Sequence, residues 1–167
     1  MLEILKPDTM VKSIYSISPE GLIKNKIFGL ILDIDNTLVA THIKKPDDNL
    51  ITYLKALKES GIKTIIVSNA KKERVEEFCK PLEIDYVYKA LKPLGRGFNL
   101  AVEKLGLPRK NIAIIGDQLF TDILGGNLNK IHTILIKPID LNEQFPIKLK
   151  RIFEKPFLYN KQYDNKL

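Results

Sequence analysis

The sequence predicts an α/β protein, with an open, doubly wound (Rossmann-like) parallel sheet that carries helices on both faces. Apolar, β-branched runs alternate with segments of helical periodicity along most of the chain. That order is typical of parallel strands joined by helices. With 167 residues, of which 44% are hydrophobic and 28% charged, the chain is long enough for one such sheet and a substantial core.

The expected strands are short apolar runs, and helical patterns fill the gaps between them. Strands are expected at residues 26–33, 63–69, 85–90, 111–117 and 131–137. Helices are expected at residues 48–61, 71–80, 94–106 and 119–125. Gly61 and Gly106 follow the last apolar positions of their helices, where glycine commonly ends a helix.

Two segments flank this core of residues 26–137. In the N-terminal segment, residues 1–25, Ser18-Pro19 favours a helix start, because serine caps a helix and proline fits its first turn. The C-terminal segment, residues 141–167, is basic and amphipathic. Since no repeat or linker divides the chain, residues 1–167 are expected to form a single domain.

The C-terminal segment contains one further helical pattern. Its apolar positions are Phe145, Leu149, Ile152 and Phe153, and its basic positions on the opposite side are Lys148, Arg151 and Lys155. Such a helix suits an anionic membrane surface. Docking of the apolar face on the protein's own sheet is the commoner outcome and is expected here. Pro156 is expected to end the helix.

Charge and composition restrict the partners and the location. The net charge is +7, and residues 147–167 contain six basic and two acidic side chains, a net +4. A basic tail attracts nucleic acid or an anionic membrane surface, although it can also be merely solvated. Cys79 is the single cysteine, which excludes an internal disulfide framework and a multi-cysteine zinc site. No apolar run approaches the roughly 20 residues of a membrane span, and no secretion signal precedes the core. These features predict a cytoplasmic protein, with peripheral contact at the inner face of the membrane.

Polar side chains follow the expected strands where each one ends. They are Asp33 and Asp35 after the first strand, Ser68 and Asn69 after the second, Lys92 after the short third, and Asp117 and Asp122 after the fourth. Because the carboxyl ends of parallel strands meet at one edge of the sheet, we expect these groups to converge. Clustered carboxylates disfavour one another's ionisation. Mg²⁺, which binds one or two carboxylates, water and a substrate phosphate, would resolve that repulsion.

The same residues fit phosphoryl transfer. Asp33 is placed to attack phosphorus, and Asp35, two residues on, can protonate the leaving oxygen and then deprotonate water. Ser68 and Lys92 supply a neutral donor and a positive charge for a phosphate. Each motif alone is weak evidence for an active site, since D-x-D more often marks an ordinary loop. Their order in one doubly wound chain carries the prediction.

The chain resembles the haloacid dehalogenase (HAD) phosphatases over residues 26–137. The matching motifs are DIDNTL (33–38), VSN (67–69), Lys92 in LKP and GDQLFTD (116–122). The resemblance implies that Asp33 is the nucleophile and a magnesium ligand, and that Asp35 is the general acid/base and ligates through its carbonyl. It also implies roles for six further residues: Thr37 orients Asp35, Ser68 and Lys92 hold the phosphoryl oxygens, Asn36 and Asn69 lie on the substrate side, and Asp117 completes the metal site. Asp122 is implied either to ligate the metal or to position water and Lys92.

The spacing between the motifs narrows the class of HAD phosphatase that the chain resembles. Asp33 and Ser68 are 35 residues apart, and Ser68 and Lys92 are 24 apart, so neither gap can hold a cap domain. The chain therefore resembles the capless subfamily IIIA phosphatases, whose open sites favour large or surface-bound substrates or a cap from another subunit. DIDNTLV and GDQLFTDILGGN further resemble the bacterial and mitochondrial phosphatidylglycerophosphate phosphatases. That likeness implies an anionic phospholipid substrate, phosphatidylglycerophosphate, and phosphatidylglycerol as product.

Other functions stay open at this point. A capless phosphatase could act on a nucleic-acid 3′-phosphate, a sugar-acid phosphate or a phosphoprotein. Phe157, Tyr159 and Tyr163 lie near Lys155 and Lys161, as nucleic-acid stacking would require, although nucleic acid is the less favoured partner. A phospho-accepting signalling module would carry its acceptor on a middle strand, and a silent scaffold would lack a key group. The sequence leaves the oligomeric state open, and His42 and His132 are interpreted as structural.

Overall fold

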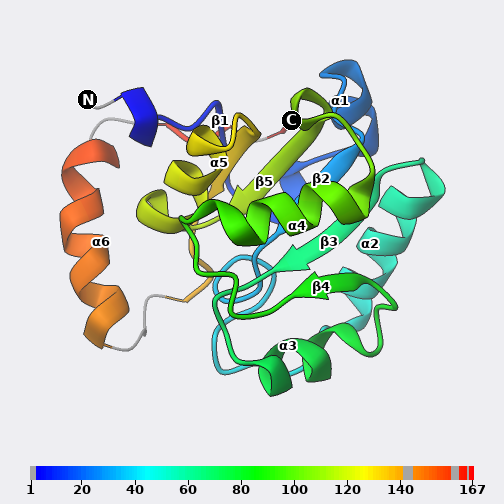
Figure 1. Cartoon of the computed structure of the whole chain (residues 1–167), viewed down its shortest axis with the longest axis horizontal. Helices are drawn as coiled ribbons and strands as arrows, with labels where there is room; N and C mark the ends of the chain where they lie inside the picture. Colours follow the sequence, from blue (N-terminus) through cyan, green and yellow to red (C-terminus); the bar gives the residue numbers. More distant parts are fainter. Residues whose placement is uncertain (1–2, 141–144, 159–161, 165) are drawn as a thin grey trace.

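A six-stranded parallel sheet forms the centre of the molecule, with the order β1-β6-β5-β2-β3-β4 (Figure 1). The structure, a computed structural model, describes residues 3–140, 145–158, 162–164 and 166–167. The strands are β1 Thr9–Val11, β2 Gly29–Leu32, β3 Lys63–Val67, β4 Asp85–Val87, β5 Ile112–Gly116 and β6 His132–Ile136. All five strands expected after residue 25 are present, and the predicted fold class is confirmed.

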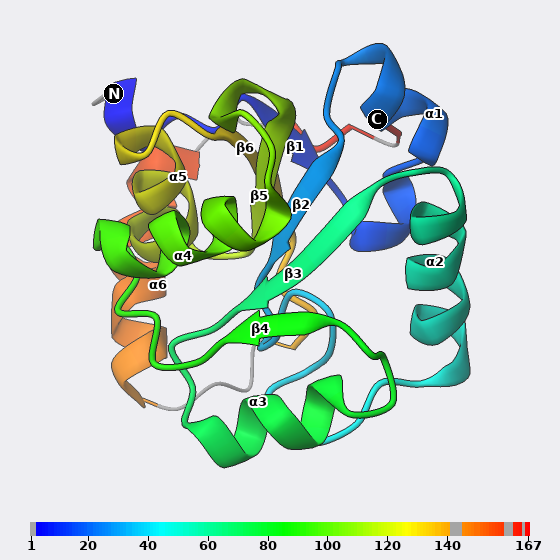
Figure 2. The ribbon, with the colours of Figure 1, turned by 45° about the vertical axis from the view of Figure 1, so that its right-hand side comes forward.

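Helices cover both faces of the sheet (Figures 1 and 2). They are α1 Pro19–Lys24, α2 Asp48–Glu59, α3 Lys72–Cys79, α4 Gly95–Leu105, α5 Leu124–Leu128 and α6 Phe145–Leu158. Short 3₁₀ turns occur at η1 Glu3–Leu5, η2 Ile14–Ser16 and η3 Arg109–Asn111, and a π turn, η4, spans Leu119–Ile123. The buried side chains of α2 and α3 pack on one face of the sheet, and those of α4 on the other. Alternate strand residues therefore enter separate cores, as a period of two requires.

Local signals placed two helix ends correctly. The Ser18 hydroxyl accepts a hydrogen bond from the Gly21 amide at 3.0 Å, and α1 begins at Pro19. Gly106 ends α4 with a φ of +62°, a left-handed conformation that an L side chain rarely adopts. The predicted helix start and helix stop are both confirmed at these residues.

The sequence prediction missed one strand. Strand β1 pairs in parallel with β6, with Thr9 opposite Ile134, so the N-terminal segment extends the sheet. Its three residues, Thr9-Met10-Val11, follow Pro7-Asp8 and contain too few apolar positions to show a strand period. The pairing is long-range, and local pattern contains no information about it.

Two expectations for α6 were wrong. The helix continues through Pro156 to Leu158, because only two helical residues follow the proline and few backbone bonds are lost. The expected apolar face is not docked on the sheet: Leu149, Ile152 and Phe153 are all exposed. The helix packs through a different side, which includes Glu154. The expectation for Phe145 lies outside the described side chains.

The sheet register places the carboxyl ends of the central strands at one level. Leu32 of β2 lies opposite both Ile66 of β3 and Ile115 of β5. Within the described residues, the connection from β2 to β3 holds α2 alone and that from β3 to β4 holds α3 alone, so neither contains a cap. No helix among the described residues has the length and apolar character needed to cross a membrane.

Candidate active site

The residues that end the central strands are fixed by the sheet itself. The backbone amide of Asp33 donates to the Ile115 carbonyl at 3.1 Å, and that of Ser68 donates to the Val87 carbonyl at 3.0 Å. Each residue thus continues the hydrogen-bond ladder by one step beyond its strand. Their side chains, and that of Asp117 after β5, emerge at the same edge.

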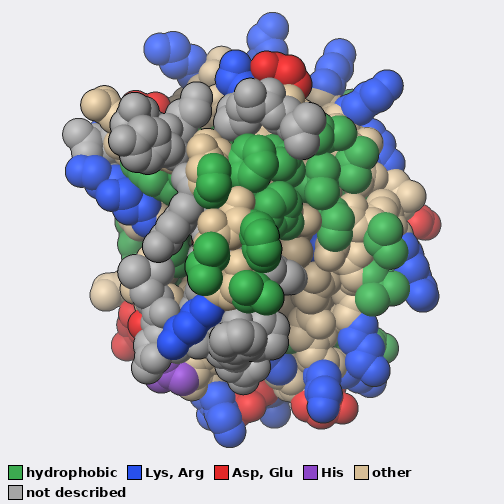
Figure 3. Space-filling view, turned by 90° about the vertical axis from the view of Figure 1, so that its left-hand side faces the viewer, with side chains coloured by type: hydrophobic (Ala, Val, Ile, Leu, Met, Phe, Trp, Pro, Cys, Tyr) green, Lys and Arg blue, Asp and Glu red, His purple; other side chains and the backbone are tan. Residues whose placement is uncertain are grey.

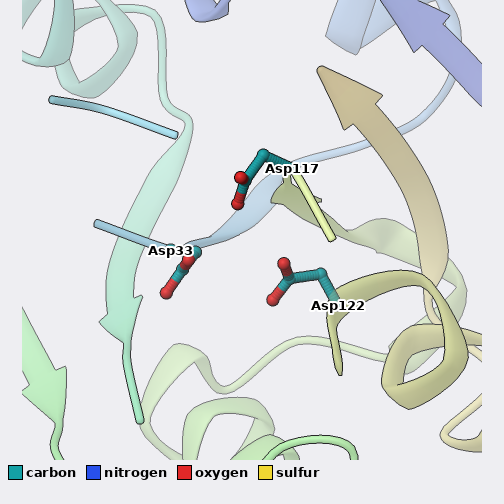
Figure 4. Close-up of side chains that lie close together, drawn as sticks. All are labelled: Asp33, Asp117 and Asp122. Atoms are coloured by element: carbon teal, nitrogen blue, oxygen red, sulfur yellow. The ribbon is translucent and has the colours of Figure 1, made fainter. Parts of the chain in front are cut away.

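Three carboxylates converge at this edge (Figure 4). Asp33, Asp117 and Asp122 are buried, and one oxygen from each lies within 4.8 Å of the others. Asp122 comes from η4, where the Gln118 amide donates to its Oδ2 at 3.2 Å. The backbone therefore orients the third acid toward the first two.

Lys92 supplies the positive charge of the cluster. Its Nζ donates to Asp33 Oδ1 at 2.8 Å and to Asp122 Oδ1 at 2.7 Å. Asn69 holds the Lys92 backbone from both sides, accepting from its amide at 2.7 Å and donating to its carbonyl at 3.1 Å. Asn69 was expected on the substrate side, and these bonds give it a positioning contact with Lys92.

Burial and neighbouring charges have opposing effects on the pKa values of Asp33 and Lys92. Burial raises the pKa of Asp33, Lys92 opposes that rise, and the neighbouring Asp122 and Asp117 add to it. Burial would lower the pKa of Lys92, but Asp122 and Asp33 outweigh it and raise the pKa above its ordinary value. The lysine is therefore charged at neutral pH, and one ammonium does not balance three buried carboxylates.

A divalent cation fits this donor set. Three carboxylates face one ammonium, which leaves a formal excess of two negative charges (3 − 1) among the described side chains. Carboxylate oxygens are the ligands that hard divalent ions prefer, and such an ion would favour the ionised form of Asp33. Asp33, Asp117 and Asp122 are the residues that could hold it.

The DIDNTL loop places its remaining residues differently from expectation. The Asp35 side chain lies outside the carboxylate cluster, so ligation through its carbonyl stays a prediction. Thr37, expected to orient Asp35, donates from its hydroxyl to Asp117 Oδ1 at 3.2 Å. Asn36, with a φ of 62°, accepts from the Asp140 amide at 3.3 Å through Oδ1. Its backbone bonds to Val39 and Ile139 show that it shapes the loop.

Ser68 lies buried at the end of β3. Its Oγ accepts a hydrogen bond from the Ala70 amide at 3.1 Å, which orients the hydroxyl at the carboxyl edge. Its expected role in holding a phosphoryl oxygen stays a prediction.

Sequence reasoning missed Arg74. This residue of α3 donates to Asp35 Oδ1 at 2.9 Å and to the Lys44 carbonyl at 3.1 Å. One signal was present: Arg74 is one of only four arginines among 27 basic residues, and it follows the VSN motif closely. Arginine can form two directed bonds at once, which lysine does less well.

Glu154 was also missed. It is 1% exposed, and its Oε1 accepts from the Phe120 amide of η4 at 3.3 Å. The bond joins α6 to the turn that carries Asp122. No local signal marks it, because an acid between Phe153 and Phe157 is typical of an ordinary amphipathic helix.

A groove lies beside the DIDNTL loop. It has a volume of about 570 Å³ and is lined largely by apolar residues from three parts of the chain, among them Tyr15, Val39 and Ile139. Thr37 belongs to its lining, and Lys12 and Lys137 lie at the same groove. The groove therefore adjoins the residue that contacts Asp117.

Acids collected at the carboxyl edge of a parallel sheet, next to a buried lysine, are groups suited to an enzyme that acts on phosphorylated compounds. A family model described as "haloacid dehalogenase-like hydrolase" matches residues 30–128. The chain belongs to this family of hydrolases.

Similar proteins agree with this assignment. The chain is 43% identical over 152 residues to "Probable phosphatase YqeG" of Bacillus subtilis (strain 168), a match that covers 91% of this chain and 88% of that protein. Among solved structures, an uncharacterized protein from Listeria monocytogenes serotype 4b gives a TM-score of 0.55 at 18% identity, covering 72% of this chain and 85% of that one. The cobalt-bound deoxy-D-mannose-octulosonate 8-phosphate phosphatase of Haemophilus influenzae gives 0.52 at 15%, covering 84% and 96%. At these identities the structural likeness is one of fold.

Proposed function

We propose that this HAD hydrolase is a phosphatase that transfers a phosphoryl group to Asp33 and then to water. The observation that carries the proposal is the position of Asp33: it directly follows β2, donates its amide to the sheet, and lies 2.8 Å from the Lys92 ammonium. A nucleophile held this firmly needs little reorganisation before it attacks.

The proposed reaction has two steps. In the first, a carboxylate oxygen of Asp33 bonds to phosphorus, the ester P–O bond breaks, and Asp35 gives a proton to the leaving alcohol oxygen. In the second, Asp35 takes a proton from water, whose oxygen bonds to phosphorus and displaces Asp33. Phosphate leaves, and both acids return to their starting states. Ser68 and Lys92 bind the phosphoryl oxygens throughout.

The proposed cofactor is Mg²⁺, held by Asp33 and Asp117, with the Asp35 carbonyl and Asp122 as further candidates. When bound, it would neutralise the carboxylates and the charge of the phosphoryl group. Thr37 would hold Asp117 in place through its hydroxyl, and Asp122 would hold Lys92.

The proposed substrate is phosphatidylglycerophosphate, with phosphatidylglycerol as product. Two features support it: the sequence likeness of the DIDNTLV and GDQLFTDILGGN segments to that group, and the absence of a cap among the described residues between β2 and β4. An enzyme without a lid can meet a head group that stays in its bilayer. The single domain of residues 1–167 and a peripheral cytoplasmic location belong to the same proposal.

The test is magnesium-dependent phosphate release from detergent-dispersed phosphatidylglycerophosphate and from soluble phosphate esters. Asp33→Asn removes the nucleophile and should lower turnover by roughly three orders of magnitude or more, because covalent catalysis fails without it. The fold should survive, since the change relieves repulsion among buried acids.

Asp85→Asn is the matched control, because that carboxylate is 65% exposed and pairs only with Lys104 among the described residues. It should leave turnover unchanged. Activity on soluble esters alone would keep the mechanism and refute the lipid substrate. Full activity of Asp33→Asn would refute the mechanism itself.

A further inference from the structure

Helix α6 is attached to the protein by one side. Glu154 is buried and accepts from the Phe120 amide, and the Phe157 ring meets the Phe120 ring edge-on at 6.1 Å. Phe157 and Leu158 pack against a small core that includes Leu119 and Ile123 of η4. These contacts fix which side of the helix faces outward.

The outward side is apolar. Leu149, Ile152 and Phe153 are 44%, 58% and 61% exposed, although residues of these types are usually buried. Their spacing of i, i+3 and i+4 places them on one helical face. In Figure 3, which looks at this side of the molecule, hydrophobic side chains gather in the middle of the surface, with Lys and Arg around much of its border.

Basic residues alternate with these apolar residues in the sequence of the helix. The Lys148 side chain is exposed, and Arg151 and Lys155 follow it in the sequence at i+3 and i+7. With the net +4 of residues 147–167, the segment combines an exposed apolar strip with positive charge. Helices of that composition lie in the interface of anionic bilayers, with the apolar residues among the acyl chains and the cations at the head groups.

We propose that the exposed face of α6, formed by Leu149, Ile152 and Phe153, binds the surface of an anionic lipid bilayer. The inference deepens the proposed function and rests on it for one point, that the bound surface also contains the substrate. A second protein would account for the apolar strip, but the net positive charge of residues 147–167 favours an anionic lipid surface.

The position of α6 connects this surface to the site. The helix lies on the side of the molecule toward which the central strands point (Figures 1 and 2). It contacts η4, the turn that supplies Asp122 to the carboxylate cluster. A bilayer bound to α6 would therefore lie alongside the catalytic edge of the sheet.

The experiment is flotation of the full chain with vesicles of phosphatidylglycerol and phosphatidylcholine, compared with pure phosphatidylcholine. The test variant is Ile152→Ser/Phe153→Ser, which removes apolar area without changing charge. Loss of this area should weaken vesicle binding by about tenfold or more. The matched control is Ile23→Ser/Leu100→Ser, which changes two side chains that are 44% and 39% exposed on α1 and α4.

The proposal predicts that the wild-type protein and the control float with anionic vesicles, and that the test variant does not. Turnover of a soluble phosphate ester should be equal in all three. Equal flotation of the test variant, or no flotation of the wild type, overturns the proposal. The proposal is also overturned if sedimentation shows that the wild type is a dimer, that the test variant is a monomer, and that neither protein binds vesicles. Failure of the proposed substrate shows separately, as absent turnover of detergent-dispersed phosphatidylglycerophosphate.

Discussion

Arg74 connects three parts of the active-site region. It extends from α3 to the carboxylate of Asp35 and to the backbone of the loop that follows, at Lys44. Its ring contact with Phe78, 5.4 Å from the guanidinium carbon, restrains it further. Since Asp35 is the proposed acid/base, its direction depends on an arginine outside the four motifs.

We expect Arg74→Ala to lower kcat on soluble esters by about tenfold, the scale of one charge-assisted hydrogen bond, with a smaller effect on KM. The kcat of Arg74→Lys should lie between that of Arg74→Ala and that of the wild type, because a single ammonium replaces two directed donors. Steady-state kinetics measure both. Lys72→Ala on the same helix is the control, as its side chain is 51% exposed and pairs with Glu76. Equal kcat for Arg74→Ala and wild type would show that Arg74 does not contribute to catalysis.

For individual residues, the sequence predicted which acids would converge but not all of their contacts. Asp33, Asp117, Asp122 and Lys92 meet because strand order and register leave little choice. Thr37 contacts Asp117 and not Asp35, and no spacing rule distinguishes the two. Side-chain direction within a loop depends on atoms from distant segments.

The end of β5 leaves no room for a side chain. A Cβ at Gly116 would overlap the Asp122 carboxylate. At the far end of the neighbouring strand, a Cβ at Gly29 would lie 2.9 Å from Leu107 Cδ1, the tip of a flexible side chain. The two glycines therefore test separately how each end of the sheet contributes.

We expect Gly116→Ala to lower kcat by roughly tenfold to a hundredfold, because Asp122 must move away from Lys92. Gly29→Ala should retain kcat and change only the thermal midpoint. Kinetics on a soluble ester and thermal melts separate the two effects. If both variants lost activity equally, the loss would reflect general damage to the sheet.

The junction of β1 and β6 has its own titratable group. Burial lowers the pKa of His132, and the nearby Asp8 carboxylate opposes that shift. His132 Nε2 lies 3.1 Å from the Thr9 hydroxyl. Because the folded pKa lies below the unfolded value of about 6.5, the stabilising contribution is present above that pH and is lost as pH falls through the folded pKa.

His132→Gln should therefore show a smaller fall in urea midpoint than wild type when the pH drops from about 7 to about 5. The glutamine amide keeps a polar partner for Thr9. His42→Gln, whose parent side chain is 71% exposed, is the control and should follow wild type. A parallel fall in all three proteins would assign the acid sensitivity to other groups.

Elements with strong internal periodicity were predictable, and those defined by distant partners were not. Helices α2 and α4 have apolar positions at helical spacing and clear ends. Strand β1 depends on β6, and the docked side of α6 depends on one buried acid, Glu154. A basic amphipathic pattern shows that a helix has two faces, but it does not show which one the protein covers.

The whole molecule has a net charge of +7. Raising the salt concentration from roughly 0.1 M to 1 M shortens the screening length from about 10 Å to about 3 Å. Turnover of phosphatidylglycerophosphate in anionic vesicles should therefore fall severalfold, whereas turnover in neutral detergent micelles should fall less. Equal losses in both systems would show that salt acts on the site and not on attraction to the surface.

The edge position of β1 affects how the chain folds during its synthesis. Thr9 leaves the ribosome early, yet its side-chain hydrogen-bond partner His132, at the start of β6, follows 123 residues later, a delay of roughly 6 to 25 seconds at ordinary rates of synthesis. On its other side, Met10 accepts a backbone bond from Asp164, which is made later still. During that interval the strands from β2 to β5 can already assemble, while Met10 and Val11 have no strand to pair with. Nascent chains halted before β6 should therefore expose their N-terminal segment to proteases and chaperones, and completion of the last strand should protect it.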